Sequence, residues 1–302
     1  MIFSTIFRMI FLLTKLAVPI TFRGQRRQTR MVNKLKALVE SGQPAIGSWI
    51  GFTDPYSVEA MADAGFDWLL IDTEHFPISR ESLRTILVAM KGSPSVPVVR
   101  LPSNSRDHFQ TALDLGAQGV VVPMVSSRED AELAVTFCRY PPLGTRGFSP
   151  TRASRYFQDL EQYAATANGQ ISLIVQIETP QAVGNIEAIL ATSGIDGIFI
   201  GPSDLASFMN LAARTNHPEV ERVVGQLIDS ACAHSMPFGL PTWTPEECLS
   251  YVKRGARLLT LGSDLHFLAN SGRSGLAGIR QLLAANPGAG LDLHSTRSEG
   301  RR

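Results

Sequence analysis

Short apolar runs alternate with longer amphipathic stretches along most of the chain. The runs are rich in Val, Ile and Leu and predict eight strands, at 45–49, 68–71, 96–100, 119–122, 172–177, 197–200, 237–240 and 258–261. Between them, apolar residues at helical spacing predict helices such as those at 56–64, 80–90, 106–115, 129–138, 181–190, 218–234 and 245–253. The predicted order is strand then helix, repeated eight times.

The predicted strands are apolar on both faces, which is typical of a parallel sheet covered by helices. Eight such units favour an α/β fold built as a closed (β/α)8 TIM barrel, which we place at residues 31–286. A doubly wound open sheet is the alternative, and it would need a glycine-rich phosphate loop after the first strand. Residues 47–51 read GSWIG, which has neither the GxGxxG spacing nor a Walker lysine.

The two ends of the chain differ from its middle. Residues 1–30 are rich in Ile, Phe, Leu and Arg, and the first acidic residue is Glu40. They form an N-terminal extension that is a mitochondrial presequence, a secretory segment, or a stretch upstream of the real start at Met31. Arg8 and Lys15 interrupt its apolar run, so we expect no stable membrane span. We predict a disordered polar tail at 287–302 and a cytoplasmic protein, or a mitochondrial one if the presequence is genuine.

Charge and cysteine content narrow the function classes. The formal net charge of the 302 residues is +1, which offers no electrostatic argument for nucleic acid as a partner. The three cysteines have no CxxC spacing. We therefore expect free thiols rather than a disulfide framework or a zinc site.

Charged side chains follow four of the predicted strands where each strand ends. They are Asp72, Glu74 and His75 after strand 68–71, Arg100 at the end of 96–100, Glu178 after 172–177, and Asp204 shortly after 197–200. The carboxyl ends of parallel barrel strands meet at one rim, where barrel enzymes keep their catalytic residues. We therefore predict the active site at this rim.

Glu178 and Asp204 follow neighbouring strands, whose ends lie about 5 Å apart in a parallel barrel. Two carboxylates that close repel each other unless a cation or a proton lies between them. A hard divalent cation such as Mg²⁺ or Mn²⁺ would suit them, with water and substrate as the other ligands. The alternative is two loop carboxylates that have no joint role.

His75 and Arg100 have more than one possible role. His75, with Asp72 and Glu74 beside it, could act as a base near neutral pH, as a third metal ligand, or as a structural histidine. The planar fork of Arg100 suits a carboxylate or an oxyanion, and it could also form an ion pair with Glu74 or Asp72. The arginine can do both.

Other residues near the strand ends give weaker signals. Trp49 could form a wall of the pocket or belong to the core. Residues 201–205 predict a strand-to-helix turn whose backbone N–H groups could bind a carboxylate. The remaining histidines, at 108, 217, 234 and 266, are expected to be structural or solvated. There is no GxSxG elbow and no lysine ends a predicted strand, so serine hydrolysis and Schiff-base chemistry lack support.

Six segments in order resemble the HpcH/HpaI aldolase family. They are DTEH at 72–75, VVR at 98–100, GAQG at 116–119, YPPLGTRG at 140–147, QIET at 176–179 and GPSDL at 201–205. The family comprises metal-dependent class II pyruvate aldolases, such as 4-hydroxy-2-oxoheptanedioate aldolase and the 2-keto-3-deoxy sugar acid aldolases. The resemblance covers roughly residues 33–285. One departure is Asn210, which stands where a glycine is common.

The resemblance implies a fold, a cofactor and a reaction. The fold is a barrel of the phosphoenolpyruvate/pyruvate superfamily with its last helix exchanged between subunits, in a homo-oligomer such as a hexamer built as a trimer of dimers. The reaction is reversible cleavage of a 4-hydroxy-2-oxo acid to pyruvate and an aldehyde by an aldehyde-lyase. A CoA-thioester lyase related to the citrate lyase β subunit is the alternative.

The resemblance also implies roles for individual residues. Glu178 and Asp204 would hold Mg²⁺, Mn²⁺ or Co²⁺. Arg100 would stabilise the enolate oxygen, and His75, oriented by Asp72, would move protons. Substrate binding would involve Arg100, Gln176, Ser203, Asp204 and Trp49.

Overall fold

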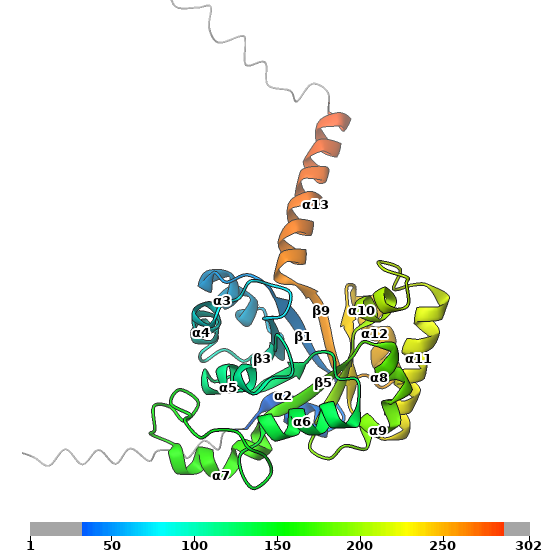
Figure 1. Cartoon of the computed structure of the whole chain (residues 1–302). Coiled ribbons are helices and arrows are strands. Elements are labelled where there is room, and N and C mark those ends of the chain that lie inside the picture. Colours follow the sequence, from blue (N-terminus) through cyan, green and yellow to red (C-terminus); the bar gives the residue numbers. More distant parts are fainter. Residues whose placement is uncertain (1–31, 287–302) are drawn as a thin grey trace, which may run out of the picture. The chain divides into compact units, whose positions relative to one another are not determined.

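Nine strand segments form one parallel sheet in the computed structural model, which describes residues 32–286 (Figure 1). The segments are β1 (Ala45–Ile50), β2 (Trp68–Asp72), β3 (Val96–Arg100), β4 (Gly119–Val122), β5 (Ser172–Ile177), β6 (Gly197–Ile200), β7 (Phe238–Gly239), β8 (Pro241–Thr242) and β9 (Leu258–Ser263). Their order in the sheet is β7-β6-β5-β4-β3-β2-β1-β9-β8. The predicted parallel α/β sheet is confirmed.

The barrel closes through one interrupted strand. β7 pairs with β6, while β8 pairs with β9, and only Leu240 separates the two segments in the chain. The predicted single strand at 237–240 is therefore wrong in this detail. A Cβ atom added to Gly239 would overlap the carbonyl oxygen of Leu258, so the chain passes β9 at a distance that only glycine permits. The result is a nearly closed (β/α)8 barrel.

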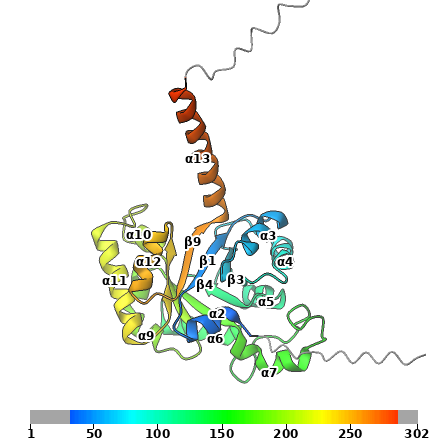
Figure 2. The same ribbon diagram turned by 180° about the vertical axis from the view of Figure 1, so that it is seen from behind.

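Helices surround the sheet and follow its strands in the chain (Figures 1 and 2). They are α2 (Lys34–Glu40), α3 (Pro55–Asp63), α4 (Arg80–Ala89), α5 (Arg106–Asp114), α6 (Arg128–Cys138), α7 (Leu160–Gln170), α8 (Pro180–Gly184), α9 (Ile186–Leu190), α10 (Pro202–Phe208), α11 (Pro218–Ala233), α12 (Pro245–Lys253) and α13 (Asp264–Ala285). The predicted helix 181–190 is broken into α8 and α9 at Asn185. The side-chain amide of Asn185 donates to the Ser126 carbonyl at 2.8 Å, which holds the break in place.

Two apolar clusters account for the strands being apolar on both faces. Alternate strand residues point inward and pack together inside the barrel, among them Trp68, Leu70 and Phe199. The residues between them, such as Leu69 and Ile71, point outward and pack beneath the helices. Burial of both faces explains the continuous apolar runs in the sequence.

Helix α2 closes the amino-terminal end of the barrel. Its residues Leu35 and Val39 are buried within the inner cluster. The Asn33 side chain caps the helix by accepting from the Lys36 amide, and its amide group donates to Gln118, Gln170 and Ser172. With this end filled, the carboxyl ends of the strands are left for a functional site.

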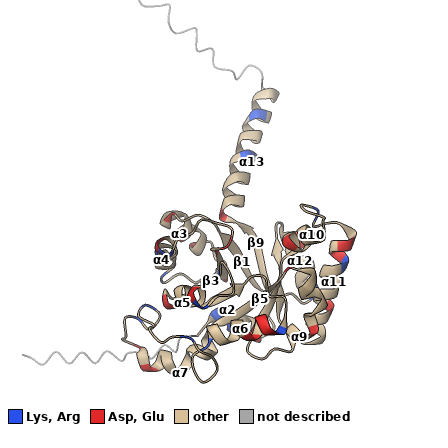
Figure 3. Cartoon of the chain, in the orientation of Figure 1, with Lys and Arg blue, Asp and Glu red and all other residues tan. Residues whose placement is uncertain are grey.

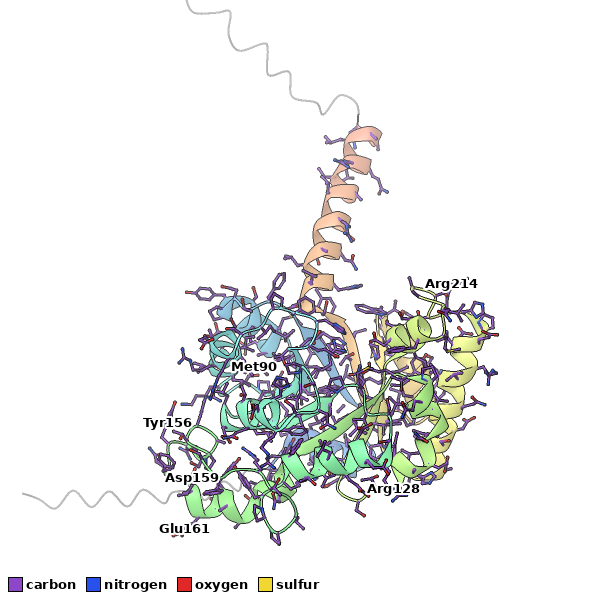
Figure 4. The ribbon with its side chains drawn as sticks, viewed as in Figure 1. Met90, Arg128, Tyr156, Asp159, Glu161 and Arg214 are labelled. Atoms are coloured by element: carbon purple, nitrogen blue, oxygen red, sulfur yellow. The ribbon has the colours of Figure 1, made fainter. Side chains whose placement is uncertain are left out.

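Helix α13 begins as part of the barrel and then leaves it (Figures 1 and 2). The buried carboxylate of Asp264 accepts from the backbone amides of Gly51 and Phe52 at the end of β1. From Asn270 to Asn286 every residue except Gly278 is exposed. Figure 4 shows the side chains of these later turns standing away from the barrel. The helix therefore has an inner part fixed to the barrel and an outer part without packing partners in residues 32–286.

Several sequence predictions concern matters outside the barrel. The predicted extension at 1–30 and tail at 287–302 lie outside the described residues. Across residues 32–286 we find no helix whose length and hydrophobicity would carry it through a bilayer. The three cysteines are free thiols, as predicted. Asn210 has a φ of 59°, a left-handed conformation that explains why glycine suits this position and that asparagine also tolerates.

Candidate active site

A cavity of about 650 Å³ lies at the carboxyl ends of the strands. Seven of the eight predicted site residues line it: Trp49, Asp72, His75, Arg100, Gln176, Ser203 and Asp204. The eighth, Glu178, is only 2% exposed and lies behind Gln176, whose side-chain amide donates to it. Residues that are far apart in the sequence are therefore brought together, as expected for strand ends at one rim.

Asp72 holds Arg100 in place. One carboxylate oxygen accepts from Arg100 Nε at 3.0 Å, and the other accepts from Nη2 at 2.6 Å. The paired side chains are 2% and 8% exposed. A buried bidentate pair of this kind is rigid, so Asp72 fixes the direction in which the guanidinium points.

Two further residues complete the surroundings of Arg100. Its Nη1 atom lies 3.3 Å from Glu74 Oε2, and its guanidinium carbon lies 4.4 Å from the ring centroid of Trp49. Trp49 in turn packs edge-on against Phe199. Trp49 thus both lines the cavity and belongs to the packed interior, and Arg100 forms ion pairs while remaining at the cavity surface.

His75 is the exposed member of the group, with 55% of its side chain accessible. Its backbone amide donates to Asp72 Oδ1 at 3.2 Å. The carboxylate oxygen nearest its ring is Oε2 of Glu74, 3.8 Å from Nε2. Asp72 therefore shapes the backbone that carries His75, whereas Glu74 is the acid that faces the imidazole.

Glu74 links the histidine to the arginine. Its Oε2 atom is buried and accepts no well-aligned hydrogen bond, although Arg100 and His75 both lie near it. Burial raises the pKa of Glu74 above its ordinary value, and the positive charges of Arg100 and His75 oppose that shift. An incompletely paired acid in such a place is typical of functional sites.

Glu178 is held by two donors after the end of β5. The Met124 backbone N–H donates to Oε1 at 2.7 Å, and Gln176 donates to Oε2. Burial, helped by the nearby carboxylates of Glu74 and Asp204, raises the pKa of Glu178 to about 7 against the lowering effect of its two donors. The acid therefore lies in an environment that favours either a proton or a cation.

The backbone around Glu178 is shaped for close approach. Met124 presents its N–H from a left-handed conformation, with a φ of 57°. A Cβ atom added to Gly201 would lie 2.8 Å from Glu178 Oε2, so only glycine leaves room for the carboxylate there. Gly201 leads into α10, whose first turn carries Asp204.

The donor set fits a hard divalent cation. Glu178 and Asp204 are the carboxylates predicted to hold it. The negative charge of Asp204 contributes to the raised pKa of Glu178, and a cation beside the two acids would offset this repulsion. Among residues 32–286 no group of three or more His, Cys, Asp or Glu side chains is placed to enclose a metal. Such a cation would accordingly take further ligands from water and substrate, as Mg²⁺ commonly does.

Some residues of the site did not stand out in the sequence. The sequence showed Glu74 beside His75, but it left open whether Glu74 or Asp72 pairs with Arg100. Phe199, Trp243, His266, Asn270 and Arg273 also line the cavity. The last three lie on α13, and the fact that this helix follows the last strand directly was the signal that could have indicated them. His266 was expected to be structural or solvated, yet it faces the cavity.

Sequence comparison places the chain among known enzymes. Residues 45–271 match the family model described as HpcH/HpaI aldolase/citrate lyase. A 5-keto-4-deoxy-D-glucarate aldolase of Escherichia coli is 40% identical over 233 residues, which cover 77% of this chain and 91% of that protein.

Solved structures agree with this placement. An HpcH/HpaI aldolase/citrate lyase family protein from Burkholderia cenocepacia J2315 has a TM-score of 0.79 and 32% identity, covering 82% of this chain and all of the other. The citrate lyase β subunit of Mycobacterium tuberculosis, solved with oxaloacetate and magnesium, has a TM-score of 0.51 and 14% identity, covering 77% and 95%. That second likeness shows the fold alone. The chain belongs to the HpcH/HpaI aldolase/citrate lyase family, and it is an aldolase, a carbon–carbon lyase.

Proposed function

We propose that this aldolase reversibly cleaves a 4-hydroxy-2-oxo acid to pyruvate and an aldehyde, with a divalent metal ion as cofactor. The observation that carries the proposal is the convergence of Arg100, His75 and two metal-type carboxylates, Glu178 and Asp204, at one barrel rim. The similarity to an aldolase of a keto-deoxy sugar acid supports it.

The bond changes follow from the substrate. A base removes the proton of the C4 hydroxyl group, and the C4–O electrons form the aldehyde carbonyl as the C3–C4 bond breaks. The electron pair of that bond becomes the C2–C3 double bond of the pyruvate enolate, with negative charge on the C2 oxygen. A proton then returns to C3 and gives pyruvate.

His75 and Arg100 supply the two kinds of help that these steps need. His75 is exposed to the cavity, where its imidazole can take and return protons. Arg100 is held rigidly by Asp72 and can stabilise the developing enolate oxygen without reorganising. Gln176, Ser203 and Trp49 line the same cavity and would orient the 2-oxo acid.

Glu178 and Asp204 would hold the metal ion, which as a bound Lewis acid would stabilise negative charge on the 2-oxo group. Glu178 is suited to this because burial and neighbouring acids already favour a positive charge beside it. The test compares Mg²⁺, Mn²⁺ and Co²⁺ as this ion.

The test is pyruvate release, coupled to lactate dehydrogenase, from a panel of 4-hydroxy-2-oxo acids. We expect pyruvate with Mg²⁺, Mn²⁺ or Co²⁺ added and none in EDTA. Equal rates with and without EDTA would contradict the metal requirement. Cleavage of CoA esters in place of the panel would instead support the alternative lyase.

We also propose that the protein is a homo-oligomer assembled through α13. The support is a row of exposed apolar side chains along α13, with Leu268 just before its outer part and Leu276, Ile279, Leu282 and Leu283 within it. Exposed apolar surface of this kind usually marks a protein interface. A hexamer is the expected form.

A cytoplasmic location also stays a prediction, and cell fractionation would test it.

A further inference from the structure

The loop between β4 and α6 reaches the end of the neighbouring strand β5 and contacts Glu178 there. The Met124 backbone N–H donates to Glu178 Oε1 at 2.7 Å. To present this N–H, Met124 takes a left-handed conformation that residues other than glycine rarely adopt, with a φ of 57°. The Met124 side chain is exposed, so its packing does little to hold that conformation. Other contacts of the loop therefore have to hold it.

Every polar group of Ser126, two residues further on, has a hydrogen-bond partner. Its hydroxyl group donates to the Met124 carbonyl at 3.3 Å and lies 2.8 Å from Thr179 Oγ1. Its amide donates to Asp130 Oδ2 at 3.0 Å, and its carbonyl accepts from Asn185 Nδ2 at 2.8 Å. Ser126 thus connects the turn at Met124 to α6, whose first turn is acidic (Figure 3), and to the residues that flank α8 on both sides.

The direction of these hydrogen bonds follows from the protons available. A hydroxyl group has a single proton to donate. Because the Ser126 hydroxyl group donates to the Met124 carbonyl, the proton between the two hydroxyl groups comes from Thr179. Thr179 Oγ1 in turn accepts from the Ala182 amide at 3.0 Å. The hydrogen bonds therefore form one continuous chain from α8 to the Met124 turn.

The same loop holds Glu178 at two points. Its Met124 amide donates to Oε1, and its Ser126 hydroxyl group binds Thr179, the buried residue that follows Glu178 in the chain. Gln176 donates to the other oxygen, Oε2. Each carboxylate oxygen therefore has one donor and keeps a further lone pair. The carboxylate cannot turn without losing these donors, so its remaining lone pairs keep a fixed direction.

We propose that Ser126 and Thr179 are positioning residues that orient Glu178 for the metal ion, and that Asn185 holds Ser126 in place for this task. We refer to these three side chains and the Met124 amide as the Glu178 brace. The inference rests on the proposed function and deepens its metal site. Groups that hydrogen-bond a metal ligand from behind commonly set the affinity for the metal, and their loss weakens binding by about 10- to 100-fold.

The Glu178 brace does more than cap helices. The caps of α6 and α8 use Ser127 and Thr179 as acceptors of backbone N–H groups. Neither cap involves the Ser126 hydroxyl group. That hydroxyl group instead holds the turn at Met124, whose amide contacts Glu178. Its loss should therefore affect the carboxylate more than the two helices.

The test measures the affinity of the metal-free protein for Mn²⁺ by isothermal titration calorimetry, together with the free energy of unfolding in urea. S126A removes the central hydroxyl group. T179V and T179S form a pair, of which only T179S keeps the hydroxyl group. S79A is the matched control, because Ser79 caps α4 and its side chain hydrogen-bonds only with Ser82 in residues 32–286.

We expect S126A and T179V to raise the Kd for Mn²⁺ about tenfold or more, and T179S and S79A to leave it within about threefold. The free energy of unfolding shows in each case how much general stability is lost. An unchanged Kd in S126A would overturn the Glu178 brace, as would an equal rise in S79A. Equal rises in T179S and T179V would also overturn it, since the hydroxyl group would then not be the cause.

Failure of the proposed function has a separate signature. Wild-type protein that does not bind Mn²⁺, Mg²⁺ or Co²⁺ would contradict the metal cofactor itself, and the Glu178 brace with it. Wild-type binding combined with an unchanged Kd in S126A would reject only the Glu178 brace.

Discussion

At the residue scale, two neighbouring acids of the site have different tasks. Asp72 is buried and its oxygens accept hydrogen bonds from Arg100 and from two backbone amides. Glu74 has one oxygen without a well-aligned donor, and it lies between Arg100 and His75. Asp72 therefore serves mainly the architecture of the site, and Glu74 is placed to influence proton transfer.

We predict that Asp72→Asn and Glu74→Gln differ in their effect on stability. Asp72→Asn breaks a buried ion pair and should lower the free energy of unfolding by about 3 kcal/mol, measured by urea denaturation. Glu74→Gln should change that free energy by less than about 1 kcal/mol yet lower kcat for pyruvate release at least about tenfold. Equal losses of stability in the two variants would contradict this division of tasks.

The sequence could predict which residues meet but not how they pair. Strand ends converge in any parallel barrel, so Asp72, Arg100 and Glu178 could be placed at one rim from the strand pattern alone. Whether Asp72 or Glu74 faces the imidazole depends on how the chain turns after β2. That turn is set by hydrogen bonds from the Glu74 and His75 amides to Asp72, which no spacing rule provides.

At the element scale, one buried carboxylate links the first strand of the barrel to its last helix. Asp264 begins α13 and accepts from the amides of Gly51, Phe52 and Leu265. It therefore ties the first strand of the barrel to the helix that forms the cavity wall. The strand pattern could predict where α13 begins. The hydrogen bond from Gly51 to Asp264 joins residues more than 200 positions apart, and no local sequence pattern predicts it.

We predict that Asp264→Ala lowers the free energy of unfolding by about 3 kcal/mol, because buried amides lose their acceptor. Asp107→Ala is the control, since Asp107 is an exposed acid in the first turn of α5 and makes no such link. Chemical denaturation of both variants measures the difference. A loss no larger than that of the control would show that the tie is unimportant.

At the scale of the whole molecule, metal binding should be visible as stability. A metal ion at one hundred times its Kd stabilises the folded state by ~2.7 kcal/mol and should raise the Tm by roughly 5 to 10 °C. We predict this rise for the wild type with Mn²⁺ and its loss in Glu178→Gln. Glu161→Gln changes an exposed glutamate on α7 (Figure 4) and should keep the rise. A full rise in Glu178→Gln would remove Glu178 from the ligand set.

Assembly is a second property of the whole molecule. We predict that the wild type is larger than a monomer by size-exclusion chromatography with light scattering, because the outer part of α13 exposes a row of apolar side chains. Leu276→Glu combined with Ile279→Glu should shift it towards the monomer. A monomeric wild type would contradict the proposal. The apolar residues were readable in the sequence, but their lack of partners within residues 32–286 depends on where the helix points.

The interrupted strand gives the barrel one weak seam. β6 and β7 share two residue pairs, as do β8 and β9, whereas β2 and β3 share five. The amide of Thr260 lies 3.4 Å from the Leu240 carbonyl, a long contact for a hydrogen bond. Local opening should begin there, so amide hydrogens of β9 beside β8 should exchange with solvent deuterium before those of β2 and β3. β8 and β9 would then separate transiently along a line that runs towards the active-site rim. Substrate binding at that rim should slow the exchange of these amide hydrogens.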